Sequence, residues 1–81
     1  MHELSVTKAL TDMAVKKAEQ RGAAKILSID VVMGKACGYE PECIEMYFEM
    51  LSQGTLAEKA VLHFETPESR EFYIDKMIVE D

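Results

Sequence analysis

The N-terminal tripeptide of this 81-residue chain, Met1-His2-Glu3, has the donor atoms of a metal chelate. The α-amine, the amide nitrogen of His2 and an imidazole nitrogen of His2 can close adjacent small rings around one cation. The amide or the carboxylate of Glu3 can supply a fourth donor. Nitrogen-rich, tetragonal surroundings suit Ni(II) and Cu(II), whereas Zn(II) favours a tetrahedron. The simpler alternative is that an N-terminal histidine is a solvated residue without a role.

The remaining residues that could bind metal have structural explanations. His63, the other histidine, falls on the polar side of an expected strand, so we interpret it as solvated. Cys37 and Cys43 are too few for a disulfide framework and are not spaced as Cys-x-x-Cys. We interpret Cys43 as a packed apolar residue and Cys37 as a loop residue. Met46 and Met50, at helical spacing, are expected to pack rather than to bind soft metals.

The composition, the net charge and the absence of known motifs exclude several classes of function. Hydrophobic residues make up 48% of the chain and charged residues 30%, which is typical of a globular domain. The net charge of −6 leaves no basic face for nucleic acid or a membrane surface. No apolar run approaches the ~20 residues of a spanning helix, and a secretion signal is not recognised, so we expect a cytoplasmic protein. The chain also lacks a nucleophile–base set, a phosphate-binding loop and an HExxH pair, so we do not expect an enzyme.

Two amphipathic helices are expected, and the N-terminal site would be attached to the start of the first. The first covers about residues 5–21, is capped by Ser5 or Thr7 and stops at Gly22. Its apolar stripe is Val6, Leu10, Met13, Ala14 and Ala18. The second begins at Glu40-Pro41 and closes at Gly54. Its apolar stripe is Ile44, Tyr47, Phe48 and Leu51, and its acidic start is explained by capping and the helix dipole: Glu40, Glu42 and Glu45.

Apolar and polar residues alternate in three segments, as they do in β-strands. Residues 25–33 place Leu27, Ile29, Val31 and Met33 on one face, and residues 60–65 form a second, half-buried strand. A turn at 66–69 precedes a third strand at 71–79, whose apolar residues change face along its length. A β-bulge near Asp75-Lys76 would bring them to one side.

Together these helices and strands predict an α/β (α+β, two-layer) fold with the order αβαββ, in a single domain covering residues 1–81. We expect a small three-stranded mixed sheet with two helices packed on one face. In this scheme the first strand crosses over through the second helix to the second strand. The second strand then returns as a hairpin to the third.

An ordered set of segments resembles the HypA family of hydrogenase nickel-incorporation proteins. The set comprises Met1-His2-Glu3-Leu4-Ser5, Arg21-Gly22-Ala23, the strand ending at Gly34, Glu40-Pro41-Glu42, Gly54-Thr55-Leu56-Ala57-Glu58, and Ser69-Arg70-Glu71-Phe72-Tyr73-Ile74. The resemblance covers nearly all of the chain.

The resemblance implies a metallochaperone whose cargo is Ni(II), bound at Met1, His2 and Glu3. Its implied partners are a hydrogenase maturation GTPase and the large subunit of a nickel–iron hydrogenase, and in some organisms the metal goes to urease. The alternative is a metal-free adaptor module that binds a GTPase or forms a homodimer through an exposed sheet edge.

One departure from the family pattern is large. The family carries a zinc module with two Cys-x-x-Cys pairs between the second and third strands, and here residues 66–69 occupy that place. Neither Cys37 nor Cys43 matches a family zinc ligand. We therefore expect no bound zinc, and the sequence leaves open whether the short form is natural or engineered.

Overall fold

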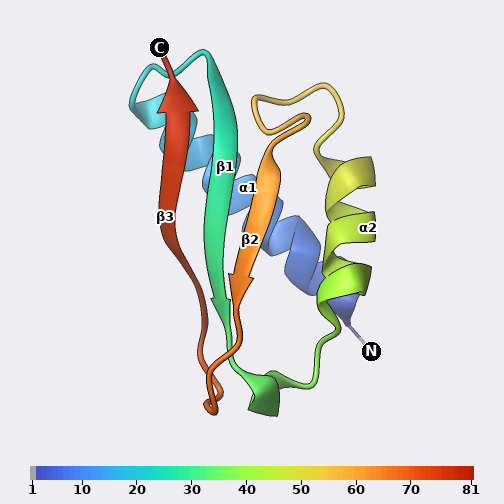
Figure 1. Ribbon diagram of the computed structural model, residues 1–81. Helices are drawn as coiled ribbons and strands as arrows, with labels where there is room; N and C mark the ends of the chain where they lie inside the picture. Colours follow the sequence, from blue (N-terminus) through green and yellow to red (C-terminus); the bar gives the residue numbers. More distant parts are fainter. Residues whose placement is uncertain (1) are drawn as a thin grey trace.

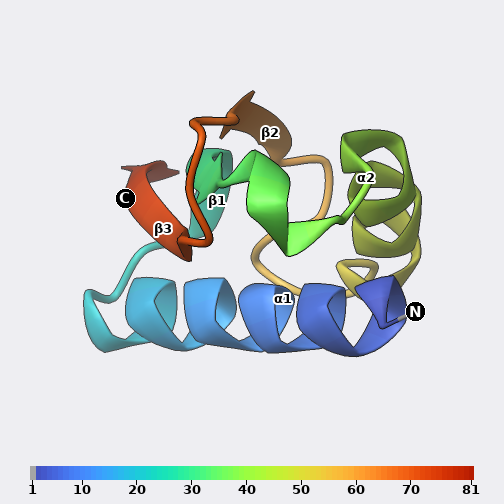
Figure 2. The same ribbon diagram turned by 90° about the horizontal axis from the view of Figure 1, so that it is seen from below.

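The computed structural model describes residues 2–81, which form one three-stranded sheet with two helices on one side (Figures 1 and 2). The elements in chain order are α1 (Glu3–Gln20), β1 (Lys25–Met33), the short 3-10 helix η1 (Lys35–Cys37), α2 (Pro41–Leu51), β2 (Val61–Glu65) and β3 (Phe72–Glu80). Helix α1 runs across one face of the sheet, and α2 packs against α1 beside β2. The predicted α/β fold class and the order αβαββ are confirmed.

The sheet has the strand order β2-β1-β3, so β1 is its centre. Strands β1 and β2 are parallel neighbours joined through α2, which confirms the predicted crossover. Strand β3 pairs antiparallel with β1 rather than with β2. The predicted hairpin is therefore wrong, because the chain passes from one edge of the sheet to the other after β2.

Helix α1 begins two residues earlier than the sequence indicated. His2 occupies the N-cap position and makes no side-chain capping hydrogen bond, so the predicted caps Ser5 and Thr7 are wrong. Both of these residues lie within the helix. Thr7 instead donates from its hydroxyl to the Glu3 carbonyl oxygen at 2.5 Å.

Two threonines take an inward position on α1 that the apolar pattern did not assign to them. Thr7 and Thr11 are buried, whereas Met13 is 51% exposed. The Thr11 hydroxyl donates to the Thr7 carbonyl oxygen at 2.8 Å. Such a bond to the preceding turn satisfies the hydroxyl, so threonine can be buried at little cost.

Two irregularities set the register between β1 and β3. Asp30 is opposite Lys76 and Val31 is opposite Ile74, so Asp75 is the extra residue and the predicted bulge is confirmed. It brings the apolar residues of β3 to the helix side, where they pack on the core: Phe72, Ile74, Met77 and Val79.

The second irregularity lies in β1, at Leu27. Ile26 pairs with Val79 and Ser28 with Ile78, which leaves Leu27 as the extra residue of β1. Ile26 is 1% exposed and Leu27 is 42% exposed. The predicted inward position of Leu27 is therefore wrong, since a bulge reverses the alternation on one side of it.

The segment between β2 and β3 is held against the end of β1. Backbone N–H groups of Gly34, Lys35 and Ala36 donate to the carbonyl oxygens of Glu71, Pro67 and Ser69, at 2.7, 2.8 and 3.0 Å. A Cβ at Gly34 would overlap the Ser69 carbonyl group. Residues 66–71, which include the place of the family's zinc module at 66–69, are thus a tightly fitted crossover.

Candidate metal site at the N-terminus

His2 lies immediately before α1, with its side chain exposed. The first hydrogen bond of the helical ladder runs from the Val6 N–H to the His2 carbonyl oxygen, at 2.9 Å. The amides of His2 and Glu3 precede the first donor of that ladder. A metal that replaced their protons would therefore break no intrahelical hydrogen bond.

The carboxyl group of Glu3 is biased toward its ionised form. Its pKa is lowered, first by a hydrogen bond with the positive α-amine of the chain and then by the backbone N–H of Glu3 itself, with a further contribution from the backbone N–H of Glu40. Glu40 immediately precedes α2, so the first turn of α1 lies beside the start of α2 (Figure 2). The carboxyl group next to His2 is thus ionised at neutral pH.

The predicted ligands fall partly outside the structure. Met1 lies outside the described residues, while His2 and Glu3 are adjacent at the exposed start of α1. Within residues 2–81, no group of three or more His, Cys, Asp or Glu side chains could hold a metal ion. A site here therefore has to draw on backbone nitrogen donors, as the chelate of Met1, His2 and Glu3 does, and that ligand set stays a prediction.

The other histidine and the cysteines lie apart from this tripeptide in the fold. His63 is exposed on β2, next to Asp30 of β1, as expected of a solvated residue. Cys37 and Cys43 are half-buried free thiols. Cys37 lies in η1 rather than in an open loop, and its Sγ donates to the carbonyl oxygen of Arg70 at 3.2 Å.

Two interpretations of α2 are corrected. Met46 and Met50 are 53% and 56% exposed, so the prediction that they pack is wrong. Ile44 and Phe48 turn inward instead, and the methionines follow two positions later on the outer surface. Glu40 occupies the N-cap position but makes no side-chain capping bond, so the helix dipole rather than capping accounts for the acidic start.

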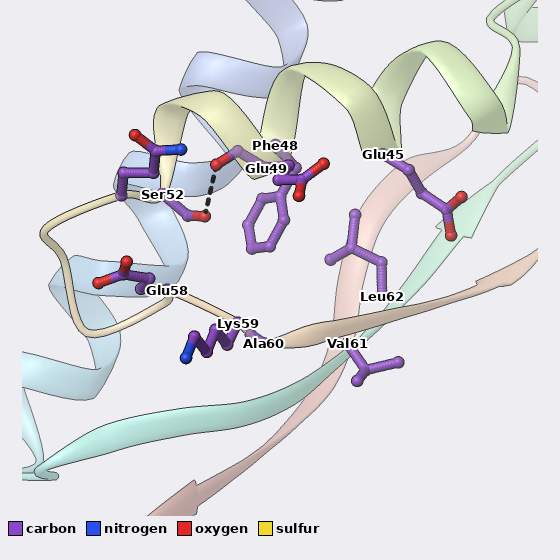
Figure 3. Close-up of a pocket in the computed structure, with 10 residues that line it drawn as sticks. Glu45, Phe48, Glu49, Ser52, Glu58, Lys59, Ala60, Val61 and Leu62 are labelled. Carbon is purple, nitrogen blue, oxygen red and sulfur yellow. Dashed lines mark hydrogen bonds between the residues drawn. The ribbon is translucent and has the colours of Figure 1, made fainter.

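A groove that the sequence pattern did not reveal lies between α2 and β2 (Figure 3). It has a volume of about 440 Å³, and its lining includes Glu45 and Glu49 of α2 and Leu62 of β2. The spacing of Glu45 and Glu49 by four residues, on the helix that leads into an edge strand, is the signal that could have indicated it.

None of the helices in the described part of the chain is both long and apolar enough to span a bilayer.

The sequence is similar to curated proteins along most of its length. Residues 1–72 match the family model described as "Hydrogenase/urease nickel incorporation, metallochaperone, hypA". The hydrogenase maturation factor HypA of Caldanaerobacter subterraneus is 47% identical over 64 residues, covering 79% of this chain and 56% of the relative. HypA of Pelodictyon phaeoclathratiforme is 41% identical over 68 residues, covering 84% of this chain and 58% of that protein. The chain thus spans somewhat more than half the length of these curated relatives.

Solved structures share the fold. The solution structure of the Ni metallochaperone HypA from Helicobacter pylori superposes with a TM-score of 0.72 at 18% identity, covering 99% of this chain and 97% of that chain. A second solution structure of HypA protein gives a TM-score of 0.66 at 21% identity, covering 96% and 72%. At these identities the likeness establishes the common fold.

Proposed function

This chain belongs to the HypA family, and from that premise we propose that it binds Ni(II) through Met1, His2 and Glu3 and delivers the metal during maturation of a nickel–iron hydrogenase, and of urease in some organisms. The observation that carries the proposal is the family match over residues 1–72, which includes the N-terminal tripeptide. Nickel is the cargo in this role, and the protein itself catalyses no reaction.

The chemistry of the tripeptide supports nickel as the cargo. Amine, amide and imidazole nitrogens form the tetragonal surroundings that Ni(II) accepts. Affinity alone should favour Cu(II) over Ni(II) at such a site, so selectivity would come from metal availability and from delivery. The exposed position of His2 lets the metal leave by ligand exchange without unfolding the domain.

The partners in this proposal are a maturation GTPase and the large subunit of a nickel–iron hydrogenase. The matched relatives are named hydrogenase maturation factors, which supports a role in that assembly. We also propose that the protein acts in the cytoplasm. We propose that it works without a bound zinc ion, since residues 66–69 stand where the zinc module was expected.

The direct test is nickel calorimetry on the untagged protein and on matched variants. A version with two residues added before Met1 keeps every side chain but removes the amine from its chelate ring. That extension and His2→Ala should each weaken nickel binding by at least about 10–100-fold. This is the loss usually seen when a residue that only hydrogen-bonds to a metal ligand is removed. His63→Ala, at the other exposed histidine, is the control and should bind as the wild type does. Equal affinity of the extended and untagged proteins would show that the amine is not a ligand.

The pH dependence gives a second test of the same site. Nickel has to displace protons from the imidazole, whose usual pKa is about 6.5, and from the α-amine, at about 7.7–8.0. Affinity should therefore rise steeply with pH from about 6 to 8. The lowered pKa of Glu3 keeps this carboxylate ionised throughout that range, so Glu3→Gln should leave the slope unchanged. A flat profile would contradict a chelate of imidazole and amine.

The alternative function is a metal-free adaptor. It is favoured by the observation that no side-chain cluster within residues 2–81 could hold a metal ion. Titration with Ni(II) separates the two functions, because a square-planar nitrogen complex produces a yellow absorption band and an adaptor produces none.

A further inference from the structure

Helix α2 lies beside the β2 edge of the sheet (Figure 1), and an open groove lies between them (Figure 3). In the described part of the chain, β2 pairs with β1 alone, so it is an edge strand. Every second residue of such a strand turns its N–H and C=O groups away from the sheet, where another strand can pair with them. The space beside β2 is therefore the position of a fourth strand, covered on one side by α2.

The groove in this space has an apolar floor and an acidic rim (Figure 3). Phe48 of α2 and Leu62 of β2 form the floor and are 3% and 8% exposed. Glu45 and Glu49 stand one helical turn apart along the rim, and Glu58 lies at the end where the chain enters β2. A side chain that enters the groove would meet both hydrocarbon and carboxylates.

The charge around the groove is unbalanced. Its lining contains three carboxylates and one cation, Lys59, in a chain with a net charge of −6. The four ion pairs described between residues 2 and 81 do not involve Glu45 or Glu49. These two carboxylates are solvated in the isolated chain and available to an external cation.

We propose that this groove binds an extended, lysine- or arginine-bearing segment of another protein, which pairs with β2 as a fourth strand. The backbone of the segment satisfies the outward groups of β2, as in other cases of strand addition. Its long side chains lay their aliphatic stems over Phe48 and Leu62 and bring their charged ends to Glu45 and Glu49. Five residues of β2, at about 3.3 Å each, accommodate a segment of about the same length.

A second copy of this chain is the less favourable occupant. Pairing of two β2 edges would bring two copies of the Glu45 and Glu49 rim to the same interface. Like charges placed together oppose association, whereas a basic segment is attracted. The charge therefore selects a cationic partner over self-association.

The test uses metal-free, isotope-labelled protein and three capped heptapeptides, so its outcome is independent of nickel binding. The peptide KVKVKVK, extended and cationic, should shift the amide resonances of β2 and of the groove side of α2, and should protect β2 amides from hydrogen exchange. Its binding should weaken as salt is raised. The peptide EVEVEVE should not bind. The peptide KKPPKPK has the same charge, but its prolines fall on both alternating phases, so neither edge of the peptide carries a full row of N–H groups. It should not bind either.

Two variants with the same change in net charge separate local from overall attraction. Glu45→Gln with Glu49→Gln should weaken KVKVKVK binding by about three- to tenfold, as expected for two exposed ion pairs. Glu19→Gln with Glu71→Gln, away from the groove, should weaken it by less than about twofold. Absence of binding, shifts that map to another surface, equal binding of KKPPKPK, or equal effects of the two variants would each overturn the proposal.

Discussion

Replacement of Gly34 by alanine tests whether the crossover between β2 and β3 is as tightly fitted as the structure indicates. An added Cβ would overlap the carbonyl carbon and oxygen of Ser69 and would lie 2.6 Å from its Oγ, whereas real Cβ contacts hardly ever fall below 3.0 Å. The colliding atoms are backbone, so no side-chain rotation relieves the overlap. Either the end of β1 or the Pro67–Glu71 segment has to move.

The loss of stability expected for Gly34→Ala follows from the contacts that this movement disrupts. Overpacking of this kind costs about 1–3 kcal/mol. Three backbone hydrogen bonds join the two segments, at 2.7–3.0 Å, and each contributes about 0.5–1.5 kcal/mol net. With one of them lost, Gly34→Ala should destabilise the domain by about 2–4 kcal/mol. For a domain of this size, that corresponds to a melting temperature about 8–32 °C lower.

The assay is thermal and urea denaturation followed by circular dichroism, with Gly38→Ala as the matched control. Gly38 lies in the same turn at φ 78°, and its Cβ would meet nothing within 4 Å. That variant should lose only about 1 kcal/mol, the cost of a left-handed conformation for alanine. Adding Ser69→Ala to Gly34→Ala should rescue little, because the closest atoms belong to the backbone. If Gly34→Ala melts within a few degrees of the Gly38→Ala control, the close fit of the crossover is refuted.

Two further predictions concern metal and folding. Removal of nickel by a chelator should leave the far-UV circular dichroism nearly unchanged, because the described core, from Leu10 to Leu62, does not include His2 or Glu3. A metal-dependent folding transition would instead make the site structural. The protein purified without a chelator should carry no stoichiometric zinc, since a tetrahedral structural site needs four ligands and the chain has two cysteines. One zinc per two chains by elemental analysis would instead indicate that Cys37 and Cys43 of two chains share an ion.

The amino-acid pattern predicted the elements and their inward faces better than the order of the strands. Alternation identifies which side of a strand is apolar, but it does not say which strand is its neighbour. A hairpin of β2 with β3 would bury the same stripes as the observed order. Val32 was the one signal of the strand order. It is an apolar residue on the otherwise polar face of β1 and is 5% exposed, as suits a central strand.

Local register was predictable only where the sequence showed a conflict. The apolar residues of β3 changed face at Asp75, which made a bulge necessary, and the structure has one there. Leu27 gave no such signal, because Ile26 and Leu27 are both apolar and either can turn inward. The same ambiguity applies at the start of α1, where Ser5 and Thr7 are good capping residues but the helix extends past them to Glu3.

The candidate site was predictable as a set of donors but not as a place in the fold. The sequence names the tripeptide, whereas only the structure places Glu3 near the backbone of Glu40 at the start of α2. The other half of α2 lines the acidic groove. Eleven helical residues span about 16 Å, so a strand bound beside β2 would lie within about one helix length of the start of α2. A partner anchored in the groove would therefore need only a short extension to approach the metal. Because His2 precedes the helical ladder, that partner could take the metal while α1 stayed intact.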